Sequence, residues 1–160
     1  MKLRLYYPIK PFQITQGFGE NLATIYKEWG LLGHPGIDMV GTFGQVIRAA
    51  CEGEVTYVGY DSNEGYGIVI RTLQQYDWET GQANFKHIYW HLLDGSARVR
   101  VGDIVSAGDV IGQCDSTGVL RGVKFGPAGL SHLHFGLKPT LPGEGLWQWD
   151  NVVQQNGYNG

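Results

Sequence analysis

The chain has 160 residues, a length that fits one domain with a sizeable hydrophobic core. Its 42% hydrophobic and 17% charged residues are typical of a globular protein and exclude an intrinsically disordered chain. The net charge of −3 and the lack of any basic run exclude an electrostatic nucleic-acid surface, and no segment is apolar enough to insert in a membrane.

The N-terminal region is expected to begin as extended chain. Its first residues, MKLRLYYPIKPF, lack the continuous apolar stretch of a signal peptide, so we expect none. The segment ITQGFGE predicts a short strand that ends in a glycine turn. Residues 21–32 predict a short helix, with Asn21 as its N-cap and Gly30 at its end.

The rest of the chain predicts short strands, because segments rich in Val, Ile and aromatic residues alternate with glycine turns. The predicted strands are two within 45–59, then 65–73, 84–93, two or more within 99–118, and 130–139. The polar residues 74–82 are expected to form a hairpin loop. We therefore predict one all-β domain over residues 1–160, with a short helical segment near its N-terminus and a weakly patterned tail at 138–160.

Two cysteines, Cys51 and Cys114, are too few to define a disulfide framework. We expect both to be small buried residues with free thiols.

The motif GHPGIDM contains the first two candidate metal ligands, His34 and Asp38. In a straight strand their Cα atoms would lie about 13 Å apart, too far for both side chains to reach one ion. Pro35 disfavours a helix at His34, and Gly36 tolerates unusual backbone angles. A bent loop that lets the two side chains converge is therefore expected.

The motif SHLHFGL contains His132 and His134 at strand spacing, so both imidazoles should point to the same face. A third motif, IYWHLLDG, contains His91. On a regular strand His87, Tyr89 and His91 would also share a face, and we interpret His87 as a structural residue.

These residues together suit a hydrolytic zinc site, which uses three protein ligands and keeps one position for water. Two histidines and one carboxylate form an established ligand set. The candidates exceed three, and a surplus imidazole is suited to proton transfer because its pKa is near neutral. There is no HExxH motif to supply another base.

The motifs, in this order, resemble the lysostaphin-type zinc endopeptidases that cleave peptidoglycan peptides. The resemblance covers about residues 14–137 and includes ITQGFG, HPGID, IRAACEGEVTYVGYDSNEGYGIVI, YWHLL, VRVGDIVSAGDVIGQCDSTG and HLHF. It implies an antiparallel sheet whose groove holds the metal on its floor, and a peptidoglycan peptide as substrate. The bond that is cleaved stays open, among glycine bridges, a D-Ala linkage to a diamino acid and stem-peptide bonds.

Transferred position by position, the resemblance implies one zinc ion per chain held by His34, Asp38 and His134. It implies that His91 and His132 are catalytic, activating the water and stabilising the tetrahedral intermediate. We expect a monomer that acts on the cell wall, in an extracellular or periplasmic location. A phage lysin, a virion-borne enzyme and a secreted enzyme trimmed of its leader all fit.

The chain departs from this family after Ser116-Thr117-Gly118. The family commonly passes from Ser-Thr-Gly almost directly into the His-x-His strand, whereas here residues 119–130 are inserted before it. We expect residues 74–82 and 119–130 to flank the metal and hold an extended peptide. Within these 160 residues we expect no counterpart of a second, wall-binding domain.

Two alternatives come from other classes of protein. A catalytically silent family member that acts as a wall-binding or regulatory module would usually lack some of these ligands. A lipoyl or biotinyl carrier would need a lysine at the tip of the hairpin in 99–118, where Gly-Asp turns stand instead.

Overall fold

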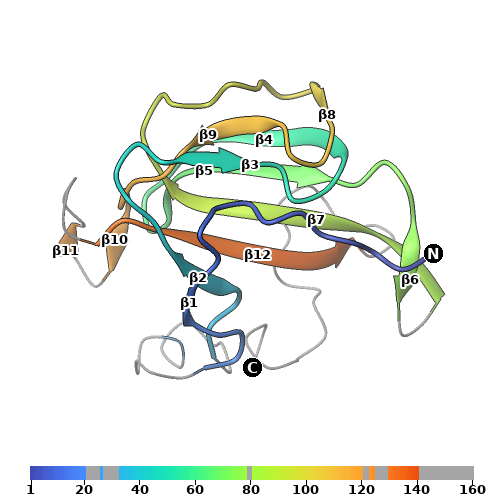
Figure 1. Cartoon of the computed structure of the whole chain (residues 1–160), viewed down its shortest axis with the longest axis horizontal. Coiled ribbons are helices and arrows are strands. Elements are labelled where there is room, and N and C mark those ends of the chain that lie inside the picture. The colour runs from blue at the N-terminus through green and yellow to red at the C-terminus, as the bar shows by residue number, and fades with distance from the viewer. Residues whose placement is uncertain (21–25, 27–32, 79–80, 121–122, 125–129, 141–160) are drawn as a thin grey trace.

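The chain folds into antiparallel β-structure, as the computed structural model in Figure 1 shows. Residues 1–20, 26, 33–78, 81–120, 123–124 and 130–140 are described; the predicted helix at 21–32 and the tail beyond 140 lie outside them, apart from Tyr26. The strands are β1 (Ile14–Gln16), β2 (Ile37–Val40), β3 (Val46–Arg48), β4 (Gly53–Asp61), β5 (Gly65–Arg71), β6 (Tyr76–Trp78), β7 (Gly81–Leu92), β8 (Ile104–Val105), β9 (Val110–Gln113), β10 (Val119–Leu120), β11 (Val123–Lys124) and β12 (His132–Thr140).

The main sheet follows the order β1-β2-β12-β7-β5-β4-β8, with β6 paired to β7. The last long strand, β12, thus lies between β2 and β7, far from both in sequence. The all-β prediction is confirmed for the described part of the chain. In that same part, no helix has the length and apolar character needed to cross a membrane.

The main hydrophobic core lies between one face of this sheet and the β3–β9 ribbon. Ile47 of β3 and Ile111 of β9 are fully buried there against Ile68, Leu92 and other residues of the main sheet. Cys114 belongs to this core and Cys51 to a smaller cluster, and both thiols are free, as predicted.

The opposite face of the sheet carries a second apolar cluster, formed by Val69, Ile88 and Trp90. The indole of Trp90 fits because Gly67 on β5 has no side chain: a Cβ there would lie 1.9 Å from a ring carbon of Trp90. Side chains alternate along β5, β7 and β12, so that each strand directs one set of side chains into the core and the other set to this second face.

The segment predicted to be a hairpin loop, residues 74–82, contains a strand and lies away from its expected position. Residues 76–78 form β6, which pairs with β7 through Tyr76 and Ala83. Ala83 and His91 are eight positions apart on the same strand, which separates them by about 26 Å. The expectation that residues 74–82 flank the metal is therefore wrong for the described residues 76–78 and 81–82, which lie at the opposite end of β7 (Figure 1).

The fit of Trp90 over Gly67 yields a stability prediction. We expect Gly67→Ala to lower the free energy of unfolding by about 1–3 kcal/mol, the usual cost of an extra carbon in a packed interior. Gly112→Ala on β9 is the control, because its Cβ would meet its neighbours only at 3.5 Å or more. Urea unfolding measures both variants, and equal midpoints for the two would contradict the packing described here.

Candidate metal centre

The centre starts from the pairing of β2 with β12. In this antiparallel register Asp38 lies opposite His134, and Asp38 Oδ1 is 3.0 Å from His134 Nδ1. The adjacent residues Leu133 and Phe135 point the other way, into the core. Strand alternation therefore places His134 on the second face of the sheet, together with Asp38.

His34 reaches the same point from the loop before β2. Its Nε2 lies 2.9 Å from His134 Nδ1 and 3.2 Å from Asp38 Oδ1. Its Nδ1–H donates to the carbonyl oxygen of Gly17 at 3.2 Å, which orients the ring and leaves the Nε2 lone pair facing the other two side chains. The bent loop predicted for GHPGID is confirmed.

Gly36 serves this loop by its lack of a side chain. A Cβ at Gly36 would lie 2.7 Å from His134 Nε2 and 2.6 Å from the carbonyl oxygen of Phe135. Glycine is therefore needed at position 36 because a side chain there would collide with the His134 ring. It is not needed for an unusual backbone angle, since the φ of Gly36 is not in the left-handed region. The sequence prediction named the right residue and gave the wrong physical reason.

The three side chains fit a metal ion. Their ligand atoms, His34 Nε2, Asp38 Oδ1 and His134 Nδ1, lie 2.9–3.2 Å from one another. Ligands around a tetrahedral zinc ion at about 2.0–2.1 Å would lie about 3.3 Å apart. The set contains two imidazoles and one carboxylate, and the Nδ1 proton of His134 is what a bound cation would displace.

Electrostatics favour a carboxylate at this point. Burial opposes ionisation of Asp38, but the hydrogen bond from His134, the close contact with His34 and the charge of the nearby imidazoles outweigh it and hold the pKa of Asp38 well below its usual range. Burial alone would lower the pKa of His134, yet the hydrogen bond to Asp38 raises it above the usual value. The Asp38 carboxylate therefore keeps its negative charge at the point where a cation would bind.

His91 reaches this centre through a β-bulge in β7. Tyr66 and Ile68 on β5 pair with Leu92 and Tyr89 on β7, so β7 contains one residue more than β5 over this stretch. His91 has φ 61°, in the left-handed region. Tyr89 and Leu92 both remain in the core, so the extra residue places His91 on the opposite face, beside Trp90.

The prediction that His87, Tyr89 and His91 share a face is therefore wrong for His91. His87 and Tyr89 do interact: the Tyr89 hydroxyl accepts the N–H of Ala50 and donates to His87 Nδ1, each at 2.7 Å. Burial lowers the pKa of His87 to about 3. The neutral, buried His87 is a structural residue, as the sequence indicated.

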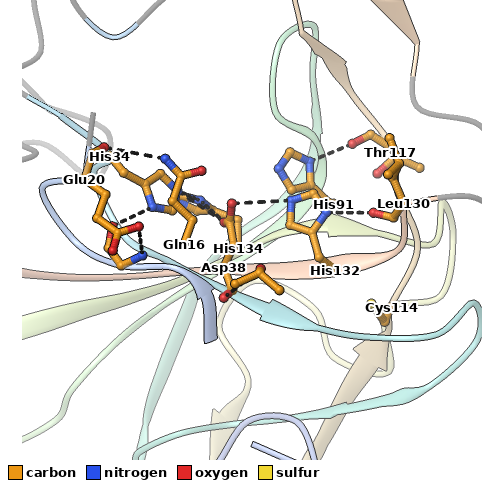
Figure 2. Close-up of polar contacts among 12 residues, drawn as sticks. Gln16, Glu20, His34, Asp38, His91, Cys114, Thr117, Leu130, His132 and His134 are labelled. Atoms are coloured by element: carbon orange, nitrogen blue, oxygen red, sulfur yellow. Dashed lines mark hydrogen bonds and ion pairs between the residues drawn. The ribbon is translucent and has the colours of Figure 1, made fainter. Parts of the chain in front are cut away.

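His91 and His132 form a second histidine pair next to the three candidate metal ligands, as Figure 2 shows. Their ring centroids are 4.6 Å apart, and the ring of His91 is 6.1 Å from that of His134. His91 Nδ1 lies 2.8 Å from the carbonyl oxygen of Thr117, and His132 Nδ1 lies 2.8 Å from that of Leu130. Because carbonyl oxygens only accept, both Nδ1 atoms carry the proton and Nε2 is the basic atom of each ring.

The His91–His132 pair lies close to the candidate metal ligands. His132 Nε2 is 3.8 Å from Asp38 Oδ2. Burial, followed by the neighbouring imidazoles of His132 and His134, lowers the pKa of His91 to about 3, so its ring is neutral at pH 7. The five residues predicted from the sequence, His34, Asp38, His91, His132 and His134, therefore converge on one site.

Three residues at this site were not singled out from the sequence. The ring of Tyr26 packs 5.7 Å from that of His34, and its hydroxyl accepts a hydrogen bond of 2.8 Å from Gln16 Nε2. Thr117 holds His91 through its carbonyl oxygen. The Ser-Thr-Gly motif was visible in the sequence, but a backbone contact leaves no residue pattern that points to His91.

Comparison with known proteins now decides the family. A model of peptidase family M23 matches residues 32–144, most of the chain. The chain belongs to peptidase family M23. The resemblance to lysostaphin-type enzymes is thereby confirmed. A relative of this M23 chain, the L-Ala--D-Glu endopeptidase of Bacillus subtilis, is 29% identical over 122 residues, which cover 73% of the chain but only 32% of that protein.

Solved structures share the M23 fold. A zinc containing peptidase from Vibrio cholerae matches with a TM-score of 0.64 and 24% identity, covering 86% of this chain and 37% of that one. The catalytic domain of lysostaphin from Staphylococcus simulans matches with a TM-score of 0.60 and 23% identity, covering 80% of each chain. This chain spans about a third of the length of the Bacillus and Vibrio proteins.

The ligand geometry predicts which substitutions release the metal. We expect Asp38→Ala and His134→Ala to lose bound metal after dialysis, because removing one of three protein ligands leaves too few to hold the ion against water. Glu54→Ala is the control, since it removes a carboxylate of β4 that pairs with Arg71. Full metal content in Asp38→Ala by elemental analysis would remove that residue from the ligand set.

Proposed function

We propose that this M23 chain is a zinc-dependent endopeptidase that hydrolyses peptide bonds in bacterial peptidoglycan, with one zinc ion held by His34, Asp38 and His134. The observation that carries the proposal is the convergence of these ligand atoms within 3.2 Å of one another, beside the His91–His132 pair. All five residues come from one chain, so a monomer suffices. It would act on the cell wall, in an extracellular or periplasmic location.

The histidine pair supplies proton transfer. Zinc, when bound, supplies a Lewis acid for the scissile carbonyl and for the attacking water. A neutral imidazole whose Nδ1–H is fixed to a carbonyl oxygen presents the Nε2 lone pair as a base. Such a ring accepts a proton from water and then, as an N–H donor, stabilises the tetrahedral intermediate or protonates the leaving amine. His91 and His132 are both held in this way.

The first functional prediction separates the metal ligands from the catalytic pair. We expect His91→Ala and His132→Ala to keep zinc but lose about 10²–10⁴-fold in wall hydrolysis, the usual contribution of a positioned proton-transfer group. Turbidity loss of purified walls, measured beside zinc content, tests this. His87→Gln is the control, because the amide oxygen can still accept from Tyr89 and His87 lies outside the site.

Two results would count against this assignment. If His132→Ala purifies without zinc, the roles of His132 and His134 are reversed. If the wild-type chain binds zinc and walls but releases no fragments, the chain is a catalytically silent binding or regulatory module. Mass spectrometry of fragments released from walls of several chemotypes identifies the bond, with the L-Ala–D-Glu bond named for the Bacillus relative as one candidate.

The second functional prediction concerns residues 119–130. Strands β10 and β11 form a hairpin between Gly118 and Leu130, at the end of the sheet where β12 begins (Figure 1). Replacing 119–129 by a tight turn, with Thr117 and Leu130 kept, should leave zinc content full and lower the rate of wall cleavage or shift the bond that is cut. We expect this because loops on a rigid scaffold commonly contact the substrate. Unchanged rate and products would show that the hairpin takes no part in recognition.

A further inference from the structure

Residues 115–118 connect the two proposed catalytic histidines. The N–H of Asp115 donates to the carbonyl oxygen of His91 at 3.0 Å, and the N–H of His132 donates to the carbonyl oxygen of Asp115 at 3.2 Å. Two residues further on, Thr117 accepts the Nδ1–H of His91 at 2.8 Å. One short segment therefore contacts the backbones of both histidines and the ring of one.

The side chain of Thr117 fixes this segment to the sheet. Its hydroxyl donates to the carbonyl oxygen of Leu92 at 2.6 Å and accepts the N–H of Tyr66 at 3.0 Å. Tyr66 and Leu92 are register partners on β5 and β7, at the edge of the bulge that contains His91. The hydroxyl thus bridges the two strands at the point where their regular pairing is interrupted.

Close backbone packing limits movement of Thr117. A Cβ on Gly65 would lie 2.3 Å from the carbonyl carbon of Thr117, and one on Gly118 would lie 2.7 Å from the carbonyl oxygen of Asn63. Both glycines have positive φ. The β4–β5 turn therefore lies directly against the peptide whose carbonyl oxygen contacts His91.

We propose that Thr117 is a positioning residue: its hydroxyl anchors the peptide whose carbonyl oxygen holds His91 in the Nδ1–H tautomer, with Nε2 directed to the reaction. A ring that lacked this acceptor would sample the other tautomer and other orientations, in which no base is in place. The kinetic part of the inference rests on the proposed function; the tautomer of His91 does not.

The chain contains a matched control for the Thr117 hydroxyl. The hydroxyl of Thr72 donates to the carbonyl oxygen of Gln74 at 2.9 Å and accepts the N–H of Phe85 at 2.9 Å. It makes the same kind of bridge between the end of β5 and β7, far from His91. Thr72→Val and Thr117→Val therefore remove equivalent hydrogen bonds, and only one of them affects the site.

The experiment combines kinetics with nitrogen NMR of the zinc-loaded chain. We expect Thr117→Val to lower kcat for wall-peptide hydrolysis by about 10–100-fold with KM and zinc content nearly unchanged, as for other residues that orient functional groups. Thr117→Ser, which keeps the hydroxyl, should retain most of kcat, and so should Thr72→Val. In 15N-labelled protein the His91 ring, assigned by loss of its signals in His91→Ala, should be the Nδ1–H tautomer in wild type and a mixture in Thr117→Val.

Several results would overturn the proposal. An Nε2–H tautomer of His91 in the wild-type chain does so without any variant. Equal losses of kcat in Thr117→Val and Thr72→Val would show a general effect on stability, and loss of zinc from Thr117→Val would assign the segment to the metal ligands. Thr117→Ala removes the same hydroxyl in a smaller side chain if Thr117→Val does not fold. A wild-type chain that cleaves no wall refutes the proposed function, while the tautomer still decides this inference.

Discussion

The antiparallel pairing of β2 with β12 puts Asp38 opposite His134, and every other part of the centre is arranged around that pair. The register is maintained by the other face of the same strands, where Met39, Leu133 and Phe135 are buried in the core. A slip of one residue would turn these apolar side chains outward and the imidazole inward. Burial of hydrophobic residues, worth about 1.5–3 kcal/mol each, therefore supplies the free energy that holds polar ligand atoms close together.

The bulge in β7 solves a conflict between packing and chemistry. Regular alternation would direct the side chain at position 91 into the core, on the same face as Tyr89. The extra residue in β7 lets both Tyr89 and Leu92 pack in the core and places the imidazole of His91 on the opposite face of the sheet. A non-glycine residue with positive φ costs of order 1–3 kcal/mol, and it persists where surrounding contacts over-determine it. The hydrogen bonds from Asp115 and to Thr117 are contacts of that kind.

Much of the site could be inferred from local rules. The spacing of His132 and His134 predicts a shared strand face, and Pro35-Gly36 predicts the bend that brings His34 to Asp38. The strands at 65–73 and 84–93 follow from their apolar residues. The face on which His91 lies could not be predicted from the sequence, because a β-bulge depends on the strand that pairs with it. Strand β6 could not be predicted either, because its polar sequence forms a strand only by pairing with β7. The placement of β12 between β2 and β7 needs tertiary information that periodicity does not contain.

The left-handed backbone at His91 has a consequence for protein engineering and for natural drift. Glycine and asparagine adopt this conformation more readily than histidine, so either residue would relieve the local strain. Selection for thermal stability alone would therefore favour replacing the imidazole, whereas the catalytic role proposed for His91 means that selection for hydrolysis would favour keeping it. Position 91 is thus a point of trade-off between stability and activity. Descendants of this fold that no longer need catalysis would be expected to lose their histidine here first.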